Sequence, residues 1–174
     1  LMKGTFDGHR AKAHIESLCA LGPRPTGSRA MADQRKLLVR HFQGLGLKCR
    51  QQRFSFNPRS APSVKMLGVN LIMSWNEPRR PRLLLAAHYD TRPIADEDSN
   101  PKRQGEPIVG ANDGASGVAV LMELARLTVE ADLPVGIDFA FFDAEEYILD
   151  PDVDRLLVGS TYFATHGVEE KEYA

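Results

Sequence analysis

Two apolar runs in the chain show no alternation with polar residues. They cover Arg82–Ala87 (RLLLAA) and Val135–Phe142 (VGIDFAFF). A continuous apolar run is typical of a strand buried on both faces at the centre of a covered sheet, whereas a half-exposed strand alternates. The weakly alternating segment Leu47–Phe56 and the segment Val64–Trp75 predict two further strands.

Helical periodicity marks four other parts of the chain. The first helix follows Asp7, whose side chain suits an N-cap, and the second runs from Arg29 to Gln43. We expect a third helix from Asp113 to about Glu130, capped by Asn112 and Asp113, and a last one in the tail with VGSTYF. The order of elements predicts an α/β fold: a three-layer α/β/α sandwich with a central mixed sheet.

Composition narrows the class of protein. The 174 residues are 43% hydrophobic and 26% charged, as in an ordinary globular chain, and residues 1–174 suffice for one domain. With 22 basic and 23 acidic residues, the charge balance gives no reason to expect nucleic acid or an anionic membrane as partner. No apolar run approaches the ~20 residues of a transmembrane segment. Cys19 and Cys49 are too few for a disulfide framework; we expect free thiols, with one bridge as the alternative.

Side chains that can bind a metal follow both apolar runs. His88 and Asp90 come after the first run, and Asp113 opens the helix that follows it. Glu145 and Glu146 come after the second run. Open α/β sheets place their sites at the carboxyl ends of strands, so we expect these side chains to gather there.

His88 and Asp90 are two residues apart, which puts them on the same side of an extended chain. The carboxylate can then accept the far N–H of the imidazole, fix its tautomer and raise the basicity of the nitrogen that binds a metal. Taken alone, the pair favours a simpler interpretation, a polar strand end with an ordinary His–Asp hydrogen bond.

Asp113 lies in GANDGASG, where glycines on both sides permit an unusual backbone conformation. By itself it would be an N-cap aspartate. A role as metal ligand gains weight because the preceding strand already supplies a histidine.

Glu145 and Glu146 are adjacent carboxylates after a buried strand, which is costly unless a cation lies beside them. A solvated loop is the alternative. One imidazole with carboxylates and an open position suits catalytic zinc better than a closed, cysteine-rich structural site. One glutamate can then bind the metal while the other acts as general base.

The motifs HYDTRP, GANDGASG and DAEE, in this order and spacing, resemble the zinc aminopeptidase and glutaminyl cyclase superfamily. The resemblance covers most of the chain, including GPRPTGS, and is strongest to bacterial glutaminyl-cyclase-like proteins. It implies that Asp113 and Glu146 bind metal and that Glu145 is the general acid/base. His88 corresponds to a zinc ligand of the two-zinc aminopeptidases, which need not bind in single-zinc cyclases, and Asp90 to the carboxylate that orients it.

The resemblance also predicts what lies beyond this chain. The family continues into a strand with another aspartate and a loop with a histidine ligand, and the chain stops at Ala174 before both. We therefore expect a catalytic domain truncated at its C-terminal end. The full-length enzyme would bind one or two zinc ions, and the 174-residue chain little or none.

The function that the resemblance implies is a zinc-dependent enzyme acting on the free N-terminus of peptides or proteins. The first hypothesis is a glutaminyl-peptide cyclotransferase, which converts N-terminal glutamine to pyroglutamate with release of ammonia. The alternatives are a metallo-aminopeptidase that hydrolyses the first peptide bond and a non-catalytic binding domain on the same fold. The resemblance implies an extracytoplasmic (periplasmic or secreted) location, and we expect the polar loop Thr91–Pro107 to rim the substrate cleft.

Overall fold

Four strands form one sheet in the computed structural model, which describes residues 4–167 and 173. They are β1 (Lys48–Phe56), β2 (Met66–Trp75), β3 (Arg82–His88) and β4 (Gly136–Phe142), in the order β1-β2-β4-β3. β2 pairs antiparallel with both β1 and β4, whereas β3 and β4 run parallel. The sheet is therefore mixed, and the predicted strands are confirmed to within two residues at each end.

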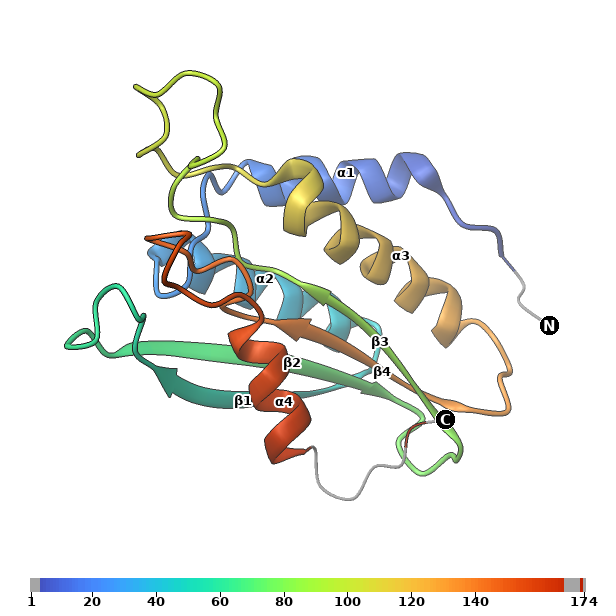
Figure 1. The fold of residues 1–174 in the computed structure, drawn as a ribbon. Helices are drawn as coiled ribbons and strands as arrows, with labels where there is room; N and C mark the ends of the chain where they lie inside the picture. Colours follow the sequence, from blue (N-terminus) through green and yellow to red (C-terminus); the bar gives the residue numbers. More distant parts are fainter. Residues whose placement is uncertain (1–3, 168–172, 174) are drawn as a thin grey trace.

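Helices cover both faces of this sheet. α1 (Gly8–Cys19), α2 (Arg29–Gly44) and α3 (Gly117–Val129) lie over one face, and α4 (Val158–His166) lies over the other (Figure 1). The predicted three-layer α/β/α arrangement is confirmed.

Of the two runs predicted to be central strands, only β4 has both faces buried. The prediction for Arg82–Ala87 is wrong within the described residues, because β3 is the edge strand of the sheet and its residues after Arg82 are only partly buried or exposed. In β4, Phe139 and Phe141 join the core under α1, α2 and α3, whereas Ala140 and Phe142 join the core under α4. Successive strand residues point to opposite faces, so a strand covered on both sides has no position for a solvated side chain. Every residue of β4 is buried, which explains the unbroken run in the sequence.

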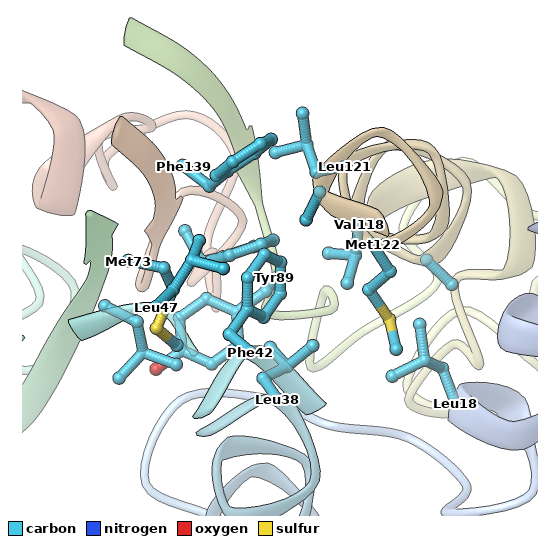
Figure 2. Close-up of a cluster of buried hydrophobic side chains, with 14 of the residues drawn as sticks. Leu18, Leu38, Phe42, Leu47, Met73, Tyr89, Val118, Leu121, Met122 and Phe139 are labelled. Atoms are coloured by element: carbon cyan, nitrogen blue, oxygen red, sulfur yellow. The ribbon is translucent and has the colours of Figure 1, made fainter. Parts of the chain in front are cut away.

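The larger core lies between the sheet and the three helices on its first face. Figure 2 shows side chains from Leu18 of α1, Phe42 of α2 and Met122 of α3 in one cluster that also contains Phe139 of β4. The ring of Phe42 lies 5.6 Å from that of Phe139 and 5.3 Å from that of Phe141, measured between centroids. Complete burial of one such side chain contributes about 1.5–3 kcal/mol, so this packing fixes the sheet on which the site is built.

One of the two predicted helix caps is correct. Asp7 Oδ1 accepts hydrogen bonds from the backbone N–H groups of His9 (2.9 Å) and Arg10 (3.2 Å) at the start of α1. The predicted cap of α3 is wrong. That helix begins at Gly117, and Asp113 lies in the preceding turn with φ −87° and ψ 105°, outside the helical region.

Cys19 and Cys49 are both free thiols, which confirms the preferred of the two alternatives. Among the described residues, no helix combines the length and the apolar character needed to cross a membrane.

Candidate metal centre

The predicted site residues lie at one edge of the sheet, where β3 and β4 both end. Because these strands are parallel and in register, His88 at the end of β3 lies beside Phe142 at the end of β4. The chain segments that follow, with Asp90 after β3 and Glu145 and Glu146 after β4, therefore start at the same edge. This is the position at which α/β sheets carry their sites.

Asp113 reaches His88 because of the turn before α3. His88 Nε2 lies 2.9 Å from Asp113 Oδ1. Gly114 makes this approach possible: its φ is +93°, and a Cβ there would lie 2.9 Å from the backbone oxygen of Asp90 and 3.4 Å from His88 Cε1. The glycine after Asp113 is thus required by the backbone, and Asp113 faces the site instead of capping the helix.

Asp90 holds the backbone of the glutamate pair. Its carboxylate is fully buried, and its two oxygens accept hydrogen bonds from the N–H groups of Glu145 (3.1 Å) and Glu146 (2.9 Å). His88 Nδ1 lies 3.6 Å from Asp90 Oδ1, an ion-pair distance that is too long for the hydrogen bond expected from the sequence. Asp90 therefore fixes the position of Glu145 and Glu146 relative to β3, a contact that the sequence did not predict.

Glu146 contacts a cation from the loop after β3. Its Oε2 lies 3.2 Å from Arg92 Nε, and Arg92 Nη1 lies 3.1 Å from Asp96 Oδ1. The sequence predicts no role for Arg92, whose only signal is its place directly after the His-x-Asp-Thr motif.

Burial and neighbouring charges raise the pKa values of three side chains of the site. Burial of the imidazole opposes its charge, but the surrounding carboxylates, Asp90 first, outweigh burial and raise the pKa of His88 to about 9. Burial raises the pKa of Glu145 above its usual value, although His88 opposes the shift. Burial and then the charge of Asp113 raise the pKa of Glu146, against the opposing effect of Arg92. A glutamate with a raised pKa is a better general acid/base near neutral pH than a solvated one.

A buried network connects the GPRPTGS segment to the site. Asp143, directly after β4, accepts hydrogen bonds from Thr26 Oγ1 (2.7 Å) and from the N–H of Val69 (2.8 Å). The N–H of Arg24 donates to Thr91 Oγ1 (2.8 Å), one residue after Asp90. These contacts support the chain on both sides of the site, so Asp143 has a structural role there.

Two open clefts adjoin the site. One, of about 400 Å³, is lined by the end of β3 at His88 and by the turn before α3, including Asn112 and Ser116. The other, of about 270 Å³, lies between Asp113 and the loop after β3; its lining includes Arg92 near the start of the loop and Ile108 directly after its end. The loop Thr91–Pro107 thus lies beside the site, as predicted, and its role as the rim of a substrate cleft stays a prediction.

The donor types present fit zinc, because imidazole nitrogen and carboxylate oxygen are its usual ligands in catalytic sites. His88 and Asp113 are already in contact. Within residues 4–167 and 173, however, no three His, Cys, Asp or Glu side chains lie close enough together to hold one ion. The described residues therefore offer a partial site: two donors in contact, with Glu146 nearby and paired with Arg92.

The fold and the residues of the site are those of a known protein family. The model of peptidase family M28 matches residues 70–174, more than half of the chain, and the chain belongs to this family. No curated protein sequence matches it significantly.

Solved structures of bacterial glutaminyl cyclases and exopeptidases resemble the chain over nearly its whole length. A glutaminyl cyclase from Fimbriiglobus ruber is 38% identical with a TM-score of 0.90, over 95% of this chain and 57% of that one. A leucine aminopeptidase precursor from Bacteroides thetaiotaomicron is 30% identical with a TM-score of 0.91, over 98% of this chain and 60% of that one. A Zn-dependent exopeptidase from Parabacteroides distasonis is 33% identical with a TM-score of 0.84, over 92% of this chain and 56% of that one. These similarities confirm the suspected superfamily. The chain spans less than two thirds of the length of these relatives, and its particular activity stays open.

Proposed function

We propose that this chain is part of a zinc-dependent enzyme that acts on the free N-terminus of peptides. The reaction that we propose for this enzyme is glutaminyl cyclisation. The observation that carries the proposal is the anchoring of Glu145 and Glu146 by Asp90 next to the His88–Asp113 contact. The 38% identity to a glutaminyl cyclase supports cyclisation as the first choice. The assignment of residues 1–174 to one catalytic domain is part of this proposal.

The roles proposed for the side chains follow their positions. Asp113 and Glu146 would bind the metal ion, together with His88 in an aminopeptidase-type site. Zinc, when bound, supplies a Lewis acid that polarises the carbonyl of the scissile or reacting amide. Glu145 is held beside the ligand Glu146 by the adjacent backbone hydrogen bond to Asp90, which places it to exchange protons with a substrate.

In cyclisation, the α-amino nitrogen of an N-terminal glutamine forms a bond to the γ-carbonyl carbon, and the bond from this carbon to the amide nitrogen breaks. Glu145 takes the proton that the attacking amine loses and delivers a proton to the departing ammonia. The raised pKa of Glu145 suits both halves of this transfer. The products are a pyroglutamyl peptide and ammonia.

Hydrolysis of the first peptide bond is the second candidate. The similarity to a leucine aminopeptidase precursor and to a Zn-dependent exopeptidase favours it, as does the contact between His88 and Asp113. In this reaction Glu145 would deprotonate the attacking water and protonate the leaving amine.

The deciding experiment incubates the full-length protein, supplied with zinc, with glutaminyl peptides and with leucine p-nitroanilide. Pyroglutamyl product with no release of p-nitroaniline supports the cyclase, and the opposite result supports the aminopeptidase. Turnover of neither substrate would count against both and favour a non-catalytic binding domain. Fractionation of the source cells tests the extracytoplasmic location, which we propose from the resemblance alone.

A further inference from the structure

Arg92 lies between a carboxylate of the proposed site and a carboxylate of the adjacent loop. Its Nε is 3.2 Å from Glu146 Oε2, and its Nη1 is 3.1 Å from Asp96 Oδ1. The three side chains are largely buried, with exposed fractions of 17% for Arg92, 16% for Glu146 and 15% for Asp96. One guanidinium therefore connects the end of β4 to the loop, in surroundings where water screens the charges only in part.

The backbone around Arg92 is fixed at several points. Its carbonyl oxygen accepts a hydrogen bond from the N–H of Ile108 (3.3 Å), which joins the two ends of the Thr91–Pro107 loop. The preceding residue, Thr91, donates its N–H to the carbonyl of Arg24 (3.2 Å). Because the main chain is held on both sides, the guanidinium has a defined reach toward Glu146.

A carboxylate has two oxygens, and Arg92 makes its ion pair at Oε2 of Glu146. A metal ion can bind the other oxygen while the guanidinium keeps the plane of the carboxylate in place. Charged partners of this kind outside the ligand set orient ligands, and their loss typically lowers metal affinity about 10- to 100-fold.

We propose that Arg92 is a positioning residue of the metal site, which orients Glu146 for the metal ion and couples it, through Asp96, to the Thr91–Pro107 loop. The inference rests on the proposed function in one respect, since it takes Glu146 as a ligand. It holds equally for a cyclase and for an aminopeptidase.

The test measures the zinc affinity of the full-length protein by competition with a chromophoric chelator. In Arg92→Gln the affinity should fall about 10- to 100-fold. The matched control is Arg103→Gln, because Arg103 lies in the same loop, is 61% exposed and pairs with two carboxylates of that loop, Asp98 and Glu106. The control should bind zinc as the wild type does.

A double-mutant cycle tests the coupling to the loop. Asp96→Asn should weaken zinc binding by a smaller factor in the wild-type background and should have no further effect when combined with Arg92→Gln. The visible spectrum of the Co²⁺-substituted protein should change in Arg92→Gln, and Arg92→Lys should recover part of the affinity because it keeps the charge but loses the fork-shaped donor. If Arg92 had a purely structural role, Arg92→Gln would leave the cobalt spectrum unchanged and Arg92→Lys would not recover zinc affinity.

Unchanged zinc affinity in Arg92→Gln would overturn the proposal. Tighter binding would overturn it too, because the guanidinium would then compete with the ion for Glu146. If Arg92→Gln does not fold, the Asp96→Asn and Arg92→Lys variants give the same decision. Failure of the ligand assignment is recognised separately, since Glu146→Gln would then retain zinc.

Discussion

At the scale of single residues, Asp90 differs most from its expected role. A carboxylate two residues after a histidine is expected to orient the imidazole, but this one accepts hydrogen bonds from two backbone N–H groups more than fifty residues away in the chain. An ionised carboxylate can be buried at tolerable cost when such donors compensate its charge. Asp90 therefore acts on the site chiefly through the glutamate pair.

Asparagine at this position offers a test. Asp90→Asn keeps the shape but turns one acceptor into a donor that faces a backbone N–H, so one hydrogen bond is lost and a buried donor is left unsatisfied. We expect the free energy of unfolding to fall by about 1–3 kcal/mol in urea titrations. The exposed Asp152→Asn serves as control and should change stability little. Equal stability of wild type and Asp90→Asn would show that the two backbone contacts contribute nothing.

The two glutamates should respond differently to the same change. Glu145→Gln in the full-length enzyme removes the proposed general acid/base, and we expect kcat to fall by about 10²–10⁴-fold while the zinc content stays near normal. Glu146→Gln is the matched variant and should lose zinc. Metal analysis beside steady-state kinetics checks both expectations. Zinc loss in Glu145→Gln instead would mean that the two roles are exchanged.

At the scale of secondary-structure elements, the sequence predicts what depends on burial and misses what depends on contacts distant along the chain. The apolar run Val135–Phe142 predicts β4 closely because both faces of that strand are buried. The run Arg82–Ala87 predicts the bounds of β3 but not its place, since β3 is the edge strand of the described sheet and Leu83 is 39% exposed. The turn before α3 escaped prediction because an aspartate next to a glycine before a helix has the same local pattern whether it caps the helix or faces His88. The pairing of Arg92 with Glu146 joins separate segments and leaves no periodic signal.

The packing of α1, α2 and α3 includes a pair of histidines with a predictable pH response. The rings of His14 and His41 lie 5.1 Å apart, and His41 Nε2 lies 3.3 Å from the carbonyl oxygen of Met122. Burial lowers the pKa of both, with the neighbouring His41 adding to the shift of His14, although Glu123 opposes it for both. The folded state therefore prefers the neutral rings.

The sign of the effect follows from these lowered values. Stability is fully present above the unfolded pKa of about 6.5 and is lost as the pH falls through it toward the folded values. We expect the wild type to lose more unfolding free energy between neutral and mildly acidic pH than a His14→Gln/His41→Gln double variant. Urea titrations of both proteins across this range make the comparison. Parallel pH profiles would contradict it.

At the scale of the whole molecule, the partial site predicts weak metal binding by the 174-residue chain. His88 and Asp113 are in contact, but the described residues bring no third histidine, cysteine or carboxylate close enough to share an ion with them. Two protein donors hold zinc poorly compared with the three of a catalytic site. We expect metal analysis of the purified chain after dialysis to find zinc well below one equivalent.

The opposite result would be informative about the reaction. One tightly held equivalent of zinc that is lost on substitution of His88, Asp113 or Glu146 would indicate aminopeptidase-type ligation and count against the cyclase. Zinc that survives all three substitutions would show that it is bound elsewhere.

The hydrogen bonds of Asp90 have a consequence for redesign. They hold the main chain at positions 145 and 146 and do not involve the side chains there. The loop after β4 can therefore keep its path when either side chain is exchanged for another. The backbone geometry of the loop and the chemistry of its side chains can then be changed independently. A library randomised at these two positions should contain many folded proteins with altered chemistry, whereas one randomised at position 90 should contain few.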